Sequence, residues 1–261
     1  MKRKTKNMKS SLSATHLLRV FALYGLVTLF ILTLTRAGFS LWRLSHVESV
    51  EGFDTLRGFA DLFVMGWRYD LALVGAVLLV PVTLGTFLSM LGPLRVLGRI
   101  IIIAFLFLGI LAVLIGEYVT PYFLHLNDAR PDLEAIKGIE NPAEAVASLW
   151  STQLIPAVIG LVLMLLIFIA FLARLEMSRL LRFRIAPLGG ITLMIVGGAL
   201  CVFAMISSVD FIKNPGTMPS LLTQESSKIS EDTLVNELSL NTAFKAGSSM
   251  VASLPLPSLP K

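Results

Sequence analysis

Ionisable and metal-ligating side chains are scarce in this sequence. Charged residues make up only 15% of the 261 residues, whereas a water-soluble domain usually carries about 25%. This low share excludes a soluble enzyme of ordinary composition. A single cysteine, Cys201, excludes an intramolecular disulfide framework and any cysteine-rich metal site. Three histidines, His16, His46 and His125, stand far apart. His46 and His125 each have only loop carboxylates nearby, so a solvated polar loop is favoured over a metal site.

Catalytic motifs are also missing. The chain has no glycine-rich phosphate loop, no GxSxG elbow and no HExxH pair. We therefore expect no catalytic residue, no metal site and no cofactor in this chain. The net charge is +5, but the basic residues form no stripe on a soluble face, so no nucleic-acid partner is predicted.

Apolar residues are abundant and come in long runs. They form 55% of the chain, and the mean hydropathy is +0.80. A helix needs about 20 apolar residues, with about 17 as the lower limit, to cross a bilayer. The sequence therefore predicts an all-α membrane protein with five transmembrane helices. The five runs cover residues 17–35, 71–91, 100–116, 154–173 and 188–206.

The five runs have no ionisable residue at their centres. Such residues mark proton and ion pathways, so their absence argues against ion-coupled transport. Pro81, in the second run, is interpreted as a simple kink. The first run is too long for a signal peptide and lacks a good cleavage site, so we expect it to remain as an anchor.

The distribution of charge predicts the orientation. Basic residues dominate 1–19 and the loops around Arg95 and Arg179, whereas acidic residues outnumber basic ones in 36–70, 117–153 and 207–261. Positive residues mark the cytoplasmic side. We therefore expect a multi-pass protein of a bacterial inner membrane, with a cytoplasmic amino terminus and an extracytoplasmic carboxyl terminus. Residues 1–16 form the basic cytoplasmic segment, and 17–206 form the transmembrane domain.

Both outer loops are predicted to contain amphipathic interfacial helices. In the first loop, apolar residues recur with helical period, which suits a helix in the headgroup plane or one packed on the bundle. They are Leu56, Phe59, Ala60, Phe63, Val64 and Trp67. In the second loop, Asn141, Pro142 and Glu144 are typical of a helix start. A shorter helical turn is expected between Pro131 and Gly138.

The remaining segment, 207–261, resembles a linker. Residues 230–244 are compatible with one helix around Leu234, Val235 and Leu238. The proline-rich end excludes a regular helix or a central strand there.

Small residues on the fifth run form a seam that allows close helix contact, either with another span or with a second protomer. These residues are Gly190, Gly197, Cys201 and Ala204.

Two polar clusters beside the spans are candidate sites for lipid headgroups. One surrounds Trp67, Arg68 and Asp70, and the other contains Arg130 and Asp132. Arginine binds phosphate through paired donors, and aromatic rings favour the headgroup layer. The alternative is that Arg68 pairs with Asp70 and Arg130 with Asp132, with a purely structural result.

These motifs, in this order, resemble one family of membrane proteins. The arrangement comprises five spans, Gly66-x-Arg68-x-Asp70 before the second span, Arg130-Pro131-Asp132 after the third, and the tail sequence at 234–241. It is similar to the membrane part of the lipoteichoic-acid-synthase-like, sulfatase-type phosphoglycerol and phosphoethanolamine transferases.

The resemblance implies an anchor that works with a sulfatase-type catalytic domain. In that family the catalytic domain follows the membrane part, binds a divalent metal and moves a headgroup from a phospholipid to an acceptor. The chain ends at Lys261, where that domain would begin. The expected function is therefore an anchor module without the catalytic domain, which is able to present phospholipid headgroups. Three explanations are open: a truncated gene product, a fragment of a longer protein, or a protein that works with a sulfatase-type catalytic partner in trans. The alternatives are a small permease or transporter subunit and a lipid-binding scaffold.

Overall fold

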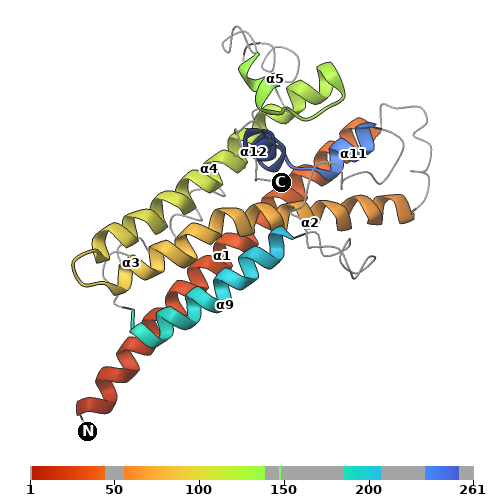
Figure 1. Cartoon of the computed structure of the whole chain (residues 1–261). Helices are drawn as coiled ribbons and strands as arrows, with labels where there is room; N and C mark the ends of the chain where they lie inside the picture. The colour runs from red at the N-terminus through yellow and green to blue at the C-terminus, as the bar shows by residue number, and fades with distance from the viewer. Residues whose placement is uncertain (1, 45–55, 139–146, 148–184, 207–232, 253–261) are drawn as a thin grey trace, which may run out of the picture.

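The described part of the chain is helical. A computed structural model describes residues 2–44, 56–138, 147, 185–206 and 233–252 (Figure 1). The elements are α1 (Lys2–Leu44), α2 (Leu56–Val80), the π-helix η1 (Pro81–Gly85), α3 (Thr86–Met90), α4 (Arg95–Asn127), α5 (Leu133–Lys137), α9 (Pro187–Met205), α11 (Thr233–Ser239) and α12 (Thr242–Ala252).

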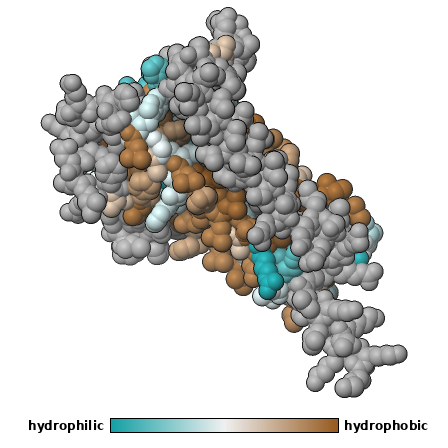
Figure 2. All heavy atoms as spheres, turned by 180° about the vertical axis from the view of Figure 1, so that it is seen from behind, coloured by the Kyte–Doolittle hydropathy of each residue, from teal (hydrophilic) through white to brown (hydrophobic). Residues whose placement is uncertain are grey.

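Within these ranges, four helical stretches are long and apolar enough to cross a membrane. They are Ala14–Trp42, Ala60–Met90, Arg95–His125 and Pro187–Met205. They correspond to the first, second, third and fifth predicted runs, to within one residue at the ends of the second and fifth, and the chain is a multi-pass helical membrane protein. The fourth predicted run, 154–173, and the helix start at Asn141 lie outside the described residues. Figure 2 shows the apolar surface across the middle of one face.

Three of the spanning helices extend beyond the charge-free runs. As a result, Arg36 lies within the first spanning stretch, Asp70 within the second and Glu117 within the third. The predicted runs are therefore shorter than the helices at these three positions. The helices continue because each charge is paired inside the protein, as described below.

The predicted interfacial helix at 56–67 is not a separate element. It is the first part of α2, which continues to Val80 without a break. Its buried face carries Leu62, Gly66 and Tyr69, whereas Val64 and Trp67 from the predicted apolar stripe are exposed. Val64 and Trp67 are therefore available to lipid, whereas Phe63 of the same stripe packs against a buried apolar cluster.

Pro81 begins a π-helical turn. Proline has no backbone N–H and clashes with the preceding turn, so it disturbs an α-helix. The N–H of Thr86 donates to the carbonyl of Pro81, five residues earlier, and the Thr86 hydroxyl donates to the same oxygen at 3.2 Å. Helix α3 then continues to Met90, so Pro81 widens one turn of the span and does not end it.

The small-residue seam of α9 packs inside the chain. A Cβ at Gly75 of α2 would lie 2.6 Å from the carbonyl oxygen of Cys201 and 3.1 Å from the Cβ of Ala204. At the other end of α9, a Cβ at Gly190 would lie 2.2 Å from Sδ of Met90. Helix α9 is therefore antiparallel to α2 and α3, and the seam makes its close contacts with a span of the same chain.

Two tail helices, α11 and α12, pack on one end of the bundle, which we call the tail end. Leu234, Val235 and Leu238 form a buried cluster with Leu62 of α2 and Leu124 of α4. The linker interpretation is therefore wrong for residues 233–252, and the predicted single helix is divided near Asn241. The predicted short helix after Pro131 is confirmed as α5.

Candidate functional site: a buried polar layer

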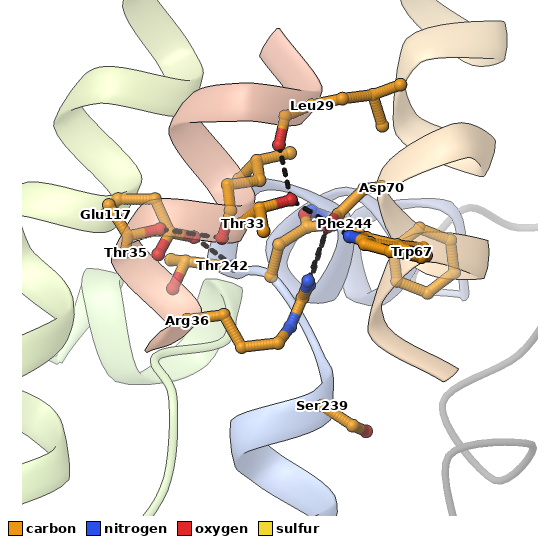
Figure 3. A network of polar contacts seen from close by, with 12 residues as sticks. Leu29, Thr33, Thr35, Arg36, Trp67, Asp70, Glu117, Ser239, Thr242 and Phe244 are labelled. Atoms are coloured by element: carbon orange, nitrogen blue, oxygen red, sulfur yellow. Dashed lines mark hydrogen bonds and ion pairs between the residues drawn. The ribbon is translucent and has the colours of Figure 1, made fainter. Parts of the chain in front are cut away.

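The most unusual feature of the bundle is a layer of buried and partly buried polar side chains at the tail end, which we call the polar layer. It consists of Arg36, Asp70, Glu117, Arg130, Glu237, Asn241, Thr242 and Lys245. The side chains come from α1, α2 and α4, from the segment after α4, from α11 and α12, and from Asn241 between these two helices. Figure 3 shows part of the polar layer.

The depth of the polar layer follows from the sequence of the spans. Arg36, Asp70 and Glu117 are each adjacent to one end of a charge-free run. At 1.5 Å per residue, the helix from Asp70 to Met90 spans about 30 Å, which matches the thickness of a hydrocarbon core. The polar layer therefore lies about one hydrocarbon thickness from the turn between α3 and α4.

Arg36 and Asp70 form a bidentate ion pair between α1 and α2. The two guanidinium nitrogens donate to the two carboxylate oxygens at 2.8 and 2.7 Å, and both side chains are almost completely buried. Gly66, one turn before Asp70, makes room for this pair. A Cβ at Gly66 would lie 2.2 Å from Cζ of Arg36, so any larger residue would displace the guanidinium.

Asn241 connects this pair to the tail. Its Nδ2 donates to Oδ1 of Asp70 at 3.0 Å, and its Oδ1 accepts the backbone N–H of Phe244 at 2.7 Å. The second bond is typical of an N-cap residue. The Phe244 ring in turn packs edge-on against Tyr69, with ring centroids 4.9 Å apart.

Arg130 and Glu117 form the second buried pair. Nη1 of Arg130 donates to the two carboxylate oxygens at 2.9 and 3.0 Å and to the Thr242 hydroxyl at 3.2 Å. The backbone N–H of Thr242 also donates to Glu117, at 3.2 Å. The Thr242 hydroxyl meets that of Thr120, one turn beyond Glu117 on α4.

The third pair, Lys245 with Glu237, belongs to the tail. Nζ of Lys245 lies 2.8 and 2.9 Å from the two carboxylate oxygens of Glu237 and donates to the Arg130 carbonyl at 2.8 Å. Arg130 returns two bonds to Glu237, from its backbone N–H at 2.9 Å and from Nε at 3.0 Å. The polar layer thus contains three cations and three anions in matched pairs, so its burial leaves no net charge.

The five residues proposed for headgroup binding have different environments. Asp70 and Arg130 are 0% and 2% exposed and are held by the polar layer. Asp132 accepts the Ala135 N–H at 2.7 Å and so caps α5. Trp67 is 49% exposed, and its indole N–H donates to the hydroxyl of Thr33 at 3.0 Å. Arg68 is partly buried on the same helix.

The alternative prediction, in which each arginine pairs with the aspartate two residues later, is wrong. Asp70 pairs with Arg36 and not with Arg68. Arg130 pairs with Glu117 and not with Asp132. Residues two apart on a helix point to different sides, which separates Arg68 from Asp70 on α2.

The sequence interpretation missed most of the polar layer. Arg36, Glu117 and Thr242 were not candidates, and Asn241 entered only as part of the tail motif. One indication was available, because Arg36, Asp70 and Glu117 each border an apolar run and so share one depth in a bilayer. Opposite charges at equal depth are expected to pair.

Neither the family models nor the solved structures contain a match for this chain. The site is therefore interpreted from its own geometry. Its charges hold the tail helices against the bundle.

Proposed function

We propose that the chain is the membrane module of a lipoteichoic-acid-synthase-like phosphoglycerol or phosphoethanolamine transferase. It anchors and orients the extracytoplasmic part and presents phospholipid headgroups to a sulfatase-type catalytic domain. The observation that carries this proposal is the attachment of residues 233–252 to α2, to α4 and to the segment after α4 through buried and partly buried hydrogen bonds. While the tail is docked in this way, an attached domain would be held close to the lipid surface.

The course of the described helices supports the five-span topology within this proposal. Helix α4 ends near the tail helices, because Thr120 meets Thr242. Helix α9 begins at the opposite end, where Gly190 meets Met90. Because the end of α4 and the start of α9 lie at opposite ends of the bundle, the chain needs one further crossing between them. The predicted run 154–173 is the candidate for it. The basic residues near the α3–α4 turn favour a cytoplasmic position for that end, and this supports an outer position for the tail helices.

The headgroup part of the proposal now rests on Trp67 and Arg68. Asp70, Arg130 and Asp132 already have protein partners. Among the described residues, Arg68 makes one weak contact, from Nη1 to Sδ of Met65 at 3.6 Å, and its Nη2, a buried atom, has no hydrogen-bond partner. Trp67, on the preceding position, is half exposed. An arginine beside an interfacial tryptophan is suited to a lipid phosphate.

The permease alternative is less well supported. It requires ionisable residues that face a pathway through the spans. The structure does place Arg36, Asp70 and Glu117 in spanning helices, but each lies in a closed pair at one end. We therefore favour the anchor.

A reconstitution experiment tests the proposal. The chain is placed in nanodiscs with fluorescent phosphatidylglycerol or phosphatidylethanolamine and Mn²⁺, with and without a soluble sulfatase-type transferase domain from the same genome. We expect diacylglycerol release by the domain to rise several-fold when the chain is present, and none from the chain alone. No stimulation with either lipid would contradict the anchor function.

A variant separates headgroup presentation from anchoring. Arg68→Ala is expected to reduce the stimulation, whereas Lys137→Ala, an exposed residue on α5, is expected to leave it unchanged. Equal stimulation by the Arg68→Ala variant would limit the proposal to anchoring.

A further inference from the structure

Two consecutive tail residues contact carboxylates on two different spans. Asn241 donates to Asp70 of α2 at 3.0 Å, and the backbone of Thr242 donates to Glu117 of α4 at 3.2 Å. Adjacent Cα atoms are fixed about 3.8 Å apart. Both contacts therefore form together only while α2 and α4 keep one separation at this depth.

The charges of the polar layer divide into groups that are each neutral. Arg36 and Asp70 pair within the bundle, and so do Arg130 and Glu117. Lys245 pairs with Glu237 inside the tail. If the tail helices left the bundle, hydrogen bonds would break, but each charge in these pairs would keep its counter-ion. The most costly consequence of breaking such a network, an uncompensated buried charge, would therefore be avoided.

We infer that α11 and α12 form a reversible strap that responds to the separation of α2 and α4. The strap is docked while Asp70 and Glu117 are in register with Asn241 and Thr242, and it is released when the two spans shift. This inference concerns movement of the chain and is independent of the transferase proposal.

Gly109 of α4 offers a way to move the spans without touching the strap. A Cβ at this position would lie 2.5 Å from Cγ1 of Val77 on α2 and 2.4 Å from the Tyr24 hydroxyl oxygen on α1. Eight residues separate Gly109 from Glu117, which is about 12 Å along the helix. Leucine at 109 would act as a wedge between α4 and its neighbours, well away from the polar layer.

The experiment measures labelling of a buried cysteine in the full chain. In a Cys201→Ser background, Ser239→Cys places a thiol on the strap at a position that is 0% exposed. A water-soluble maleimide reacts there only when the strap opens. Ser89→Cys, at a position that is 1% exposed on α3, reports opening of the bundle itself.

The double variant Asn241→Ala/Thr242→Val tests the attachment. We expect its labelling rate at residue 239 to rise at least tenfold, with an unchanged rate at residue 89. An unchanged rate at 239 would show that these contacts do not hold the strap. A parallel rise at 89 would show that the tail is an integral part of the bundle, which also overturns the inference.

The wedge variant Gly109→Leu tests the response to span separation. It is expected to raise the rate at 239 by a similar factor while the rate at 89 stays constant. The matched control is Gly92→Ala, because a Cβ at Gly92 meets no atom within 4 Å. Release by the double variant but not by the wedge would refute the response to separation.

Discussion

Asn241 and Asp70 lie 171 residues apart in the chain, and the side-chain amide of the first donates a 3.0 Å hydrogen bond to the carboxylate of the second. The same Asn241 side chain caps α12 through the N–H of Phe244. One residue therefore starts a helix and attaches it to the bundle. This double use explains why the tail changes direction at Asn241 and is not one continuous helix.

The two roles of Asn241 can be separated by substitution. Asp and Ser both serve as N-caps, but Asp would place a second carboxylate beside Asp70, and like charges at this distance cannot both ionise easily. We expect Asn241→Asp to loosen α12 far more than Asn241→Ser. Hydrogen exchange of the α12 peptide measures the difference, and equal protection in the two variants would contradict the contact with Asp70.

Loss of one partner of the Arg36–Asp70 pair should be costly. Asp70→Asn leaves the buried Arg36 guanidinium without its counter-ion, and such changes lower the free energy of unfolding by about 3–5 kcal/mol. Replacement of both residues, Arg36→Met with Asp70→Leu, should cost much less because no charge remains. Unfolding in mixed micelles measures both variants. A double variant less stable than Asp70→Asn would contradict this account.

Gly66→Ala tests the space that the pair requires. The new Cβ would overlap the Arg36 guanidinium, and forced overpacking typically lowers the free energy of unfolding by about 1–3 kcal/mol. In the Arg36→Met/Asp70→Leu background the cost should fall, because a flexible methionine adapts. Gly38→Ala is the matched control, since nothing lies within 4 Å of that position. Equal effects at 66 and 38 would exclude the steric explanation.

The spans were predictable because the information is local. A charge-free run such as 100–116 is read directly from the sequence, and helix α4 contains it. The ends of the helices were not predictable by the same rule. Glu117 is accommodated in the spanning helix because Arg130 neutralises its charge. Arg130 lies after the end of α4, beyond Asp128, which has a left-handed φ of 53°.

Tertiary contacts also explain why the predicted ion pairs and the predicted linker differ from the structure. Nearness in sequence suggested that Arg68 pairs with Asp70, but the helix turns these side chains apart and brings Arg36 to Asp70 from α1. The apolar residues of the tail, such as Val235, were visible in the sequence. Their burial could not be inferred, because it depends on Leu62 and Leu124 in distant helices.

The contacts of α9 with α2 and with α3 predict unequal effects of two glycine substitutions. A Cβ at Gly75 would press on the backbone carbonyl of Cys201, whereas one at Gly190 would meet the end of the Met90 side chain. Backbone cannot move aside as methionine can. We expect Gly75→Ala to destabilise the protein clearly more than Gly190→Ala in the same unfolding assay, and the reverse order would contradict this packing.

The proposed orientation predicts the signals of two topology reporters. Alkaline phosphatase is active only outside the cytoplasm, and green fluorescent protein folds well only inside it. An odd number of crossings, with the basic end of the bundle inside, requires phosphatase activity for a fusion after Lys261 and fluorescence for a fusion truncated at Gly92. Residue 92 lies in the turn between α3 and α4, at the end of the bundle opposite the polar layer. A fluorescent fusion after Lys261 would mean an even number of crossings. It would place the tail helices in the cytoplasm, where they could not hold a catalytic domain near the outer lipid surface.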